Sequence, residues 1–317
     1  MVEENVLITG AGGQLGVELA MELVKKYGTE SIVATDINSS ARQSLDFCQF
    51  EELDVLDIAK LEDLIVENNI TQVYHLAAIL SANGEADPIN TWHINMQSLL
   101  NVLEMAKRFR IKMFWPSSIA VFGLGSPQFA TPQNPPMVPE TIYGISKQSG
   151  ENWCNYYAEK YGVDVRSVRY PGLIGYKTLP GGGTTDYAVA IFHKALQEEH
   201  FECYLTEETE LPMMYMPDAV KAAISIMDVP SDKLRIRTAY NISGMSFTPD
   251  EIYQEIKKSY PDFTMSFEPD HRQDIANSWP RTIDDTRAKM DWDWKPSFNL
   301  EAMVLDMLAH LPKTVVH

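Results

Sequence analysis

The first half of the chain alternates short apolar runs with longer amphipathic segments. The apolar runs are rich in β-branched residues and have the length of buried strands. In the amphipathic segments, apolar residues recur with the period of an α-helix. The pattern predicts strands at residues 6–9, 31–36, 47–53, 72–77, 112–117 and 164–170, and helices at residues 14–26, 57–67, 88–108 and 143–161. Strands that alternate with helices form a parallel sheet covered on both faces, so we predict a doubly wound α/β fold.

The second half of the chain loses this regularity. After Tyr170, proline and glycine interrupt the pattern at short intervals. Residues 217–227 nevertheless predict an amphipathic helix that can return to the sheet. We therefore expect a first domain at residues 1–175, to which residues 215–245 return, and an interleaved smaller lobe at residues 176–214 and 246–317.

Composition narrows the possible partners and locations. The chain has 317 residues, and its 26 basic against 44 acidic side chains give a net charge of −18, which repels nucleic acid and acidic membrane surfaces. Cys48, Cys154 and Cys203 lack the spacing of zinc ligands, so we expect reduced thiols and no metal. No signal peptide and no membrane-spanning apolar stretch is recognisable, which favours a cytoplasmic protein.

A glycine-rich turn follows the first predicted strand and precedes the first predicted helix. Its sequence is Gly10-Ala-Gly-Gly13-Gln-Leu-Gly16, and Asp36 ends the next predicted strand. Such glycines let the backbone and the helix N-terminus approach a pyrophosphate, and the carboxylate accepts hydrogen bonds from ribose hydroxyls. A plain tight turn with an exposed aspartate is the alternative. The strand, the glycine spacing, the helix and the acidic residue all match a dinucleotide site, so we predict a Rossmann domain. We expect it to prefer NAD to NADP, because the Asp36 carboxylate repels the 2′-phosphate of NADP.

A tyrosine and a lysine stand four residues apart at the start of the helix predicted at 143–161. Tyr143 and Lys147 therefore share one helix face. A phenol has an ordinary pKa of about 10, and a nearby ammonium together with the positive nicotinamide of NAD favours its phenolate form, so Tyr143 is a candidate general base. An exposed helix pair is the plain alternative. Ser117 and Ser118 lie where ligands of such sheets bind, and a serine hydroxyl there can hold a substrate hydroxyl against Tyr143.

Together these motifs resemble the extended short-chain dehydrogenase/reductase family. Further matches are Leu53-Asp-Val55, His75-Leu-Ala-Ala78, Ser117-Ser-Ile-Ala-Val-Phe-Gly123, Tyr143-Gly-Ile-Ser-Lys147 and Arg169-Tyr-Pro-Gly-Leu-Ile-Gly175. The resemblance implies catalysis by Ser118, Tyr143 and Lys147, with Lys147 also holding the nicotinamide ribose. It implies cofactor contacts from Gly10, Gly13, Gln14, Leu15, Gly16, Asp36, Asp54, Val55, Leu76, Ala77, Ala78, Asn95, Tyr143, Lys147 and Tyr170.

Most members of this family act on nucleotide sugars, which is the first alternative for the substrate. The segment Leu211-Pro-Met-Met-Tyr-Met-Pro-Asp218 lacks the arginine that such enzymes place near a diphosphate, and Ile119 and Ala120 stand where a dehydratase needs acids. Three segments instead resemble the threonine dehydrogenase branch of the family, at residues 80–85, 180–188 and 274–280. This resemblance implies NAD-dependent oxidation of L-threonine at C3 to 2-amino-3-oxobutanoate.

The same branch suggests where the amino acid binds. The glycines and hydroxyls around Thr184 suit a carboxylate, although an N-cap on a glycine loop is the plain alternative. Trp279 either closes the apolar side of the substrate or anchors the second lobe. The expected substrate contacts are Ser81, Ser118, Tyr143, Gly182, Thr184, Thr185 and Trp279.

Two further expectations concern assembly and activity. The resemblance implies a homodimer joined by the helices predicted at 88–108 and 143–161. A third hypothesis is an NAD-binding sensor without catalysis. The intact Ser118, Tyr143 and Lys147 argue against it, because a binding module does not need a poised base.

Overall fold

A six-stranded parallel sheet forms the centre of the larger lobe. The computed structural model describes residues 4–179, 183–197 and 199–311. The sheet has the strand order β3 (Gln49–Glu52), β2 (Ile32–Asp36), β1 (Val6–Thr9), β4 (Gln72–His75), β5 (Lys112–Phe114), β7 (Val165–Arg166). All neighbouring pairs are parallel, as in a doubly wound fold, so the predicted fold class is confirmed.

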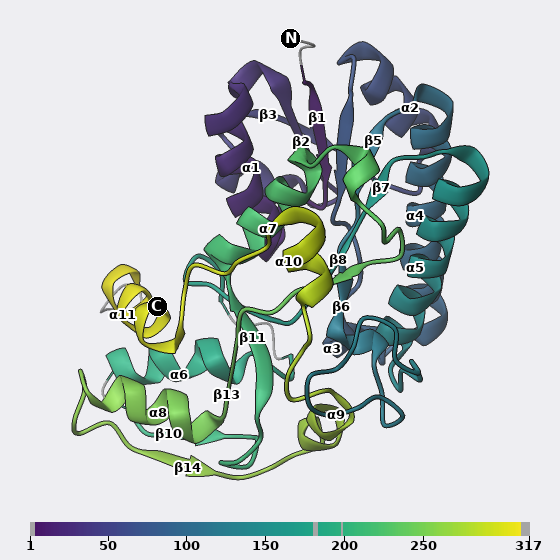
Figure 1. Cartoon of the computed structure of the whole chain (residues 1–317). Helices are drawn as coiled ribbons and strands as arrows, with labels where there is room; N and C mark the ends of the chain where they lie inside the picture. The colour runs from purple at the N-terminus through teal and green to yellow at the C-terminus, as the bar shows by residue number, and fades with distance from the viewer. Residues whose placement is uncertain (1–3, 180–182, 198, 312–317) are drawn as a thin grey trace.

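Helices cover both faces of this sheet because both faces are apolar. Along β1, Val6 and Ile8 enter one core and Leu7 enters another. One face packs against α1 (Gln14–Tyr27) and α7 (Met216–Asp228), and the other packs against α2 (Ile58–Glu67), α4 (Pro88–Phe109) and α5 (Ile142–Tyr161). Figure 1 shows α4 and α5 side by side at one flank of the sheet.

The helices begin and end where local chemistry directs. Asp57, Asp87 and Thr141 accept backbone N–H bonds at the N-termini of α2, α4 and α5, and Gly28 ends α1 in a conformation with φ of +91°. All five predicted helices, at residues 14–26, 57–67, 88–108, 143–161 and 217–227, lie within one residue of the observed bounds.

Two predicted strands are each divided in the structure. The strand predicted at 112–117 ends at Phe114, because Pro116 has no N–H to donate to a ladder, and β6 (Ser117–Ser118) joins a different sheet. The strand predicted at 164–170 changes partner at Ser167, so that β8 (Val168–Tyr170) pairs with β6 and with β12 (Tyr240–Asn241). This second sheet turns Ser118 and Tyr170 away from the central ladder.

A second hydrophobic core lies outside the central sheet. A three-stranded sheet holds β9 (Gly172–Ile174), β11 (Leu211–Tyr215) and β13 (Met245–Phe247), and β10 (Phe201–Cys203) pairs with β14 (Met265–Phe267). Figure 1 shows these strands below the central sheet. The remaining helices are α3 (Ser81–Gly84), α6 (Tyr187–Leu196), α8 (Pro249–Lys257), α9 (Arg272–Ser278), α10 (Thr286–Trp292) and α11 (Leu300–His310).

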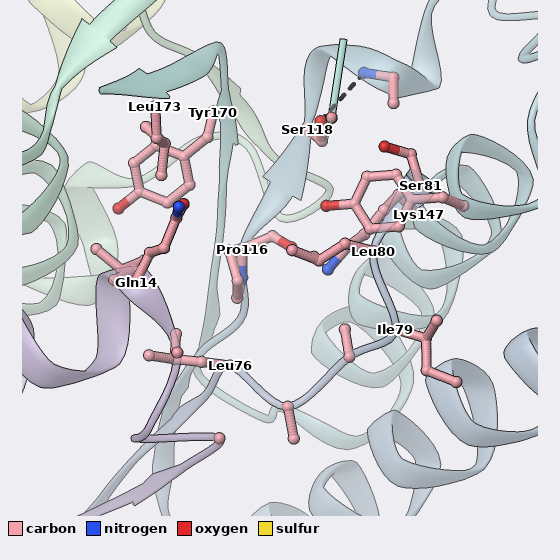
Figure 2. Close-up of a pocket in the computed structure, with 18 of the residues that line it drawn as sticks. Gln14, Leu76, Ile79, Leu80, Ser81, Pro116, Ser118, Lys147, Tyr170 and Leu173 are labelled. Carbon is pink, nitrogen blue, oxygen red and sulfur yellow. Dashed lines mark hydrogen bonds between the residues drawn. The ribbon is translucent and has the colours of Figure 1, made fainter. Parts of the chain in front are cut away.

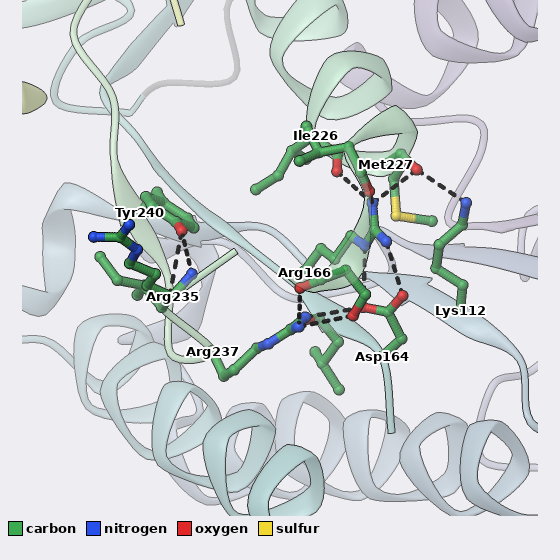
Figure 3. Close-up of polar contacts among 12 residues, drawn as sticks. Lys112, Asp164, Arg166, Ile226, Met227, Arg235, Arg237 and Tyr240 are labelled. Carbon is green, nitrogen blue, oxygen red and sulfur yellow. Dashed lines mark hydrogen bonds and ion pairs between the residues drawn. The ribbon is translucent and has the colours of Figure 1, made fainter. Parts of the chain in front are cut away.

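Two cations fasten α7 to the edge of the central sheet. The last carbonyls of a helix have no partner within it and attract positive charge. Arg166 of β7 donates to the carbonyls of Ile226, Met227 and Val229, and Lys112 of β5 donates to that of Met227 (Figure 3). The chain thus returns from the smaller lobe and is fixed against β5 and β7.

Two kinds of feature are absent from the described residues. No helix among them is both long and apolar enough to cross a bilayer. Nowhere in the same residues do three or more histidine, cysteine, aspartate or glutamate side chains gather so that they could hold a metal ion.

Candidate active site

A cavity of about 600 Å³ opens where the parallel strands end. Its volume lies in the range of cofactor and ligand sites, and its position at the carboxyl ends of the strands is the one expected for this fold. All predicted site residues line it except two. Gly182 lies outside the described residues, and Asn95 lies behind the wall.

The two ends of the cavity have different linings. We call the turn from Gly10 to Gly16 with Asp36 the glycine end, and the group Ser81, Thr184, Thr185 and Trp279 the loop end. Figure 2 shows Ser118, Ser81 and Lys147 on one side of the cavity and Gln14, Tyr170 and Leu173 on the other.

At the glycine end, Gly10 brings two turns into contact. Its φ is +69°, a conformation that favours glycine, and a Cβ there would lie 2.6 Å from the backbone nitrogen of Ala77. No side chain caps α1 at Gly13. The first N–H groups of α1 therefore face the cavity without a side-chain acceptor, which suits an anion.

Asp36 is held by the backbone at the same end. Its Oδ2 accepts from Gly12 N at 2.9 Å and its Oδ1 from Asn38 N at 2.9 Å. A carboxylate has about four acceptor positions, so these two bonds fix its orientation and leave positions for the hydroxyls of a ribose.

Ser118, Tyr143 and Lys147 meet in the middle of the cavity. Ser118 comes from β6, and the other two come from the first turns of α5. The Lys147 Nζ donates to the Pro116 carbonyl at 2.7 Å and lies 5.5 Å from the centre of the Tyr143 ring. The structure thus brings together the three residues whose spacing suggested a proton-transfer group.

Burial governs the pKa values of Tyr143 and Lys147. Burial raises the pKa of Tyr143 to about 12, and the hydrogen bond with Ser118 only partly opposes this rise. Burial also lowers the pKa of Lys147 to about 7, against the attraction of Cys154 and Glu151. In the structure the ammonium faces the Pro116 carbonyl and the Trp115 ring, at 4.5 Å from the ring centre, so desolvation dominates at the phenol.

Behind this group lies a buried ion pair. Glu151, one turn after Lys147 on α5, accepts from both Nε and Nη2 of Arg169, at 2.8 and 2.7 Å. The Ser117 hydroxyl donates to the same carboxylate at 2.6 Å, and Arg169 also donates to Asn241. Because these partners satisfy the buried charges, the network fixes α5 against the strand that carries Ser118.

Asn95 acts on the wall of the cavity from behind. Its amide accepts from Ile79 N at 2.7 Å and donates to the Ile79 carbonyl at 3.0 Å. It also donates to the Ser146 hydroxyl of α5. Asn95 therefore fixes the segment before Ser81, and in the structure it does so without lining the cavity where we expected a direct cofactor contact.

At the loop end, segments from distant parts of the chain meet. Ser81 begins α3, Thr184 and Thr185 precede α6, and Trp279 follows α9. Thr184 is buried, and the Gly183 N–H donates to the Asp186 carboxylate at 2.9 Å. Trp279 both lines the cavity and belongs to a hydrophobic core cluster.

The sequence did not identify part of the lining. The additional residues are mostly apolar neighbours of predicted ones: Ile37, Leu56, Ile79, Ile94, Pro116, Ile119, Ala120, Gly172 and Leu173. Each follows or precedes a predicted strand or motif by a few residues. Only their proximity to a motif could have identified these residues from the sequence. An apolar residue can equally line a cavity or belong to the hydrophobic core.

Known proteins share both the sequence and this architecture. The profile of the NAD dependent epimerase/dehydratase family matches residues 6–243. An uncharacterized epimerase/dehydratase of Staphylococcus epidermidis is 44% identical over 98% of this chain and 98% of its own.

Solved structures agree. An L-threonine dehydrogenase from Cupriavidus necator in its holo form is 52% identical with a TM-score of 0.94, over 96% of this chain and 99% of its own. A protein described as a monomeric L-threonine 3-dehydrogenase from a metagenome database, in its apo form, is 45% identical with a TM-score of 0.92, over 96% and 97%. The chain therefore belongs to the NAD dependent epimerase/dehydratase family.

Proposed function

We propose that the protein is an L-threonine 3-dehydrogenase, which oxidises the C3 alcohol of L-threonine to the ketone of 2-amino-3-oxobutanoate with NAD. One observation carries the proposal. A single cavity joins the glycine end to Ser118, Tyr143 and Lys147 and continues to the hydroxyl-bearing loop end. The similarity to solved L-threonine dehydrogenases at about half identity, over nearly the whole chain, supports the choice of substrate.

The glycine end fits NAD. The first N–H groups of α1 would hold the pyrophosphate, and Asp36 would accept from the hydroxyls of the adenosine ribose, where NADP carries a 2′-phosphate that the carboxylate would repel. Asp54 and Val55 would contact the adenine, and Leu76, Ala77, Ala78 and Tyr170 the rest of the dinucleotide. When bound, NAD supplies the acceptor for the hydride.

The proton leaves the substrate toward Tyr143. Ser118 would hold the C3 hydroxyl, and the Tyr143 phenolate would take its proton while the C3 hydrogen departs with its electron pair. The C–O bond becomes a carbonyl, so one proton and one hydride leave the alcohol in total. Because burial opposes the phenolate, positive charge beside it is required, and Lys147 is the basic side chain placed to supply it.

The loop end would hold the amino acid. Ser81, Thr184 and Thr185 offer hydroxyls and backbone N–H groups to a carboxylate, and Gly182 is proposed with them from the sequence. Trp279 would close the apolar side around the methyl group. Such fixed contacts give the near-attack geometry that hydride transfer needs.

A nucleotide-sugar epimerase or dehydrogenase is the second candidate, since family members share the dinucleotide site. The lining argues against a second diphosphate. Among the described residues of the cavity wall, Lys147 is the only lysine or arginine, whereas Asp36, Asp54 and Asp186 are acidic. A sugar diphosphate needs cations that this wall lacks in its described part.

The domain division also remains a proposal. We assign residues 1–175 with 215–245 to NAD, and residues 176–214 with 246–317 to the substrate. The packing of α7 against α1 and the pairing of β12 with β8 support the return of the chain to the first domain.

We further propose a homodimer joined through α4 and α5. The support is a set of exposed apolar and aromatic side chains on these two helices: Ile89, Trp92, Ile145, Trp153, Tyr156 and Tyr161. Sedimentation at micromolar concentration tests this, and an active monomer across the range would contradict it.

The three free thiols are consistent with a reducing compartment, and we place the enzyme in cytoplasmic threonine catabolism.

The function is tested by following NADH formation with a panel of substrates, and by analysing the sugar product with UDP-glucose, because an epimerase returns its hydride to the sugar and releases no NADH. L-threonine, L-serine, D-threonine and UDP-glucose are compared with NAD, and L-threonine is repeated with NADP. We expect turnover confined to L-threonine or strongest with it, and faster with NAD. Bound NAD with turnover of UDP-glucose alone would assign the protein to the epimerase alternative, and bound NAD without any turnover to the sensor.

A further inference from the structure

One tyrosine outside the cavity touches the backbone of the loop end. The hydroxyl of Tyr204, directly after β10, donates to the Gly183 carbonyl at 2.8 Å. The same carbonyl accepts from Asp186 N at 3.1 Å, which closes the turn that presents Thr184 and Thr185. Tyr204 does not line the cavity, and so it reaches the substrate end only through this turn.

The ring of Tyr204 packs against a cation and against a second aromatic ring. The guanidinium carbon of Arg272, at the start of α9, lies 3.1 Å from the ring centre, and Asp270 holds this guanidinium in an ion pair at 2.6 Å. The edge of Tyr187 packs on the ring with centroids 6.4 Å apart. A ring fixed in this way carries its hydroxyl to one position.

The contact of Tyr204 with Arg272 connects two parts of the loop end. The helix α9 leads directly to Trp279, and Gln273 of this helix donates to the Thr209 hydroxyl at 3.0 Å. Tyr204 therefore lies between the turn at Gly183 and the helix that carries Trp279 into the cavity wall. Its hydroxyl sets the spacing between the polar and the apolar contacts of the loop end.

We propose that Tyr204 is a positioning residue for substrate binding, which fixes Thr184 and Thr185 against Trp279 through the Gly183 carbonyl. The proposal deepens the proposed function and rests on it for the identity of the substrate. The proposal predicts different effects on the binding of the two ligands. The glycine end has no contact with Tyr204, so loss of the hydroxyl affects the amino acid and leaves the dinucleotide unaffected.

A neighbouring tyrosine provides a matched control. Tyr187 is fully buried, packs on Tyr204, and its hydroxyl has no hydrogen-bond partner among the described residues. Tyr187→Phe and Tyr204→Phe remove the same atom from adjacent rings of the same lobe. Only the second change breaks a bond to the turn.

The kinetic test compares KM for L-threonine and for NAD in the two variants. Loss of one neutral hydrogen bond predicts a rise of roughly 3- to 10-fold in KM for L-threonine in Tyr204→Phe, with KM for NAD and the melting temperature near those of the wild type. Tyr187→Phe should match the wild type. Arg272→Lys keeps the charge but loses the planar stack, and should raise the same KM less.

A second measurement separates this proposal from the proposed function. Hydrogen exchange of peptides containing Gly183 to Asp186 should be faster in Tyr204→Phe than in Tyr187→Phe, whatever the substrate is. A wild type inactive with L-threonine defeats the proposed function, and the exchange result still decides the role of Tyr204. Equal exchange in both variants, or an equal rise in KM for both ligands, would overturn the positioning role.

Discussion

At the glycine end, the cavity wall is backbone at the ends of adjacent strands, whereas at the loop end it is side chains from three distant segments. Gly10 touches Ala77 across two neighbouring strands of one sheet, and Asp36 is fixed by backbone N–H groups at 2.9 Å. Thr185 and Trp279 instead come from separate segments of the chain, and the Tyr204 hydroxyl donates to the Gly183 carbonyl near the first of them. The first end is set by the ends of neighbouring strands, and the second by the packing of separate segments.

This difference teaches where binding and selectivity reside. A wall built from strand ends presents the same N–H groups for any side chains around it, which suits a ligand shared across a family. A wall built from loops can be altered one residue at a time, which suits a variable substrate. The middle of the cavity, with Ser118, Tyr143 and Lys147, joins the two ends.

The largest effect is expected in the middle. Tyr143→Phe removes the proton acceptor and should lower turnover by about 10² to 10⁴, while NAD affinity stays nearly unchanged. Steady-state NADH formation and equilibrium binding of NAD measure the two quantities. Turnover equal to that of the wild type would remove Tyr143 from the reaction.

The next effect distinguishes a glycine of the cavity from one outside it. Gly10→Ala and Gly28→Ala both place a side chain at positive φ, which costs about 1 to 2 kcal/mol. The new Cβ meets the backbone at Ala77 only in Gly10→Ala, and nothing lies within 4 Å at Gly28. We expect Gly10→Ala to weaken NAD binding and to destabilise more in urea unfolding. Equal losses of stability and unchanged NAD binding in both variants would contradict the close-contact role.

A smaller effect tests the carboxylate of the glycine end. Asp36→Ala removes a charged acceptor, whose hydrogen bonds are worth about 1.5 to 3 kcal/mol, so NAD should bind roughly 10- to 100-fold more weakly. NADP should lose much less, because the repulsion of its extra phosphate also disappears. Equal losses for both dinucleotides would separate Asp36 from the ribose.

A further effect concerns stability below neutral pH and does not involve a ligand. Burial lowers the pKa of His75, at the end of β4, to about 3 from its ordinary value of 6.5. Between these values the unfolded chain binds a proton that the folded chain does not, so the free energy of unfolding falls as pH falls from about 6.5, by up to about 1.4 kcal/mol per pH unit.

This slope is checked by urea unfolding between pH 7 and pH 4. His75→Gln should show a flatter dependence than the wild type. His93→Gln changes an exposed histidine of α4 and should keep the wild-type slope. Identical slopes in all three proteins would show that His75 takes up its proton without unfolding.

The sequence predicted the glycine end well because its signals are local. A strand, glycines, a helix and an acid occur within 36 residues, and each has a direct backbone consequence. The bounds of the five predicted helices agree to within one residue for the same reason, because caps and periodicity are local.

Other features depend on tertiary packing and were not predictable. The change of partner at Ser167, the bond of Asn95 to Ile79 and the bond of Tyr204 to Gly183 each join segments whose proximity no spacing reveals. The burial that raises the pKa of Tyr143 could not be predicted for a similar reason. Burial is a property of the assembled site, and so is the bond of the Lys147 Nζ to the Pro116 carbonyl.

The most direct test of the account follows one atom through the cavity. The wild-type protein is incubated with NAD and L-threonine that carries deuterium at C3, and the reduced dinucleotide is analysed by mass spectrometry. The account predicts one deuterium in each NADH formed, with 2-amino-3-oxobutanoate or its decarboxylation product as the partner. NADH without deuterium, or no NADH from a protein that binds NAD, would contradict hydride transfer from C3 of L-threonine.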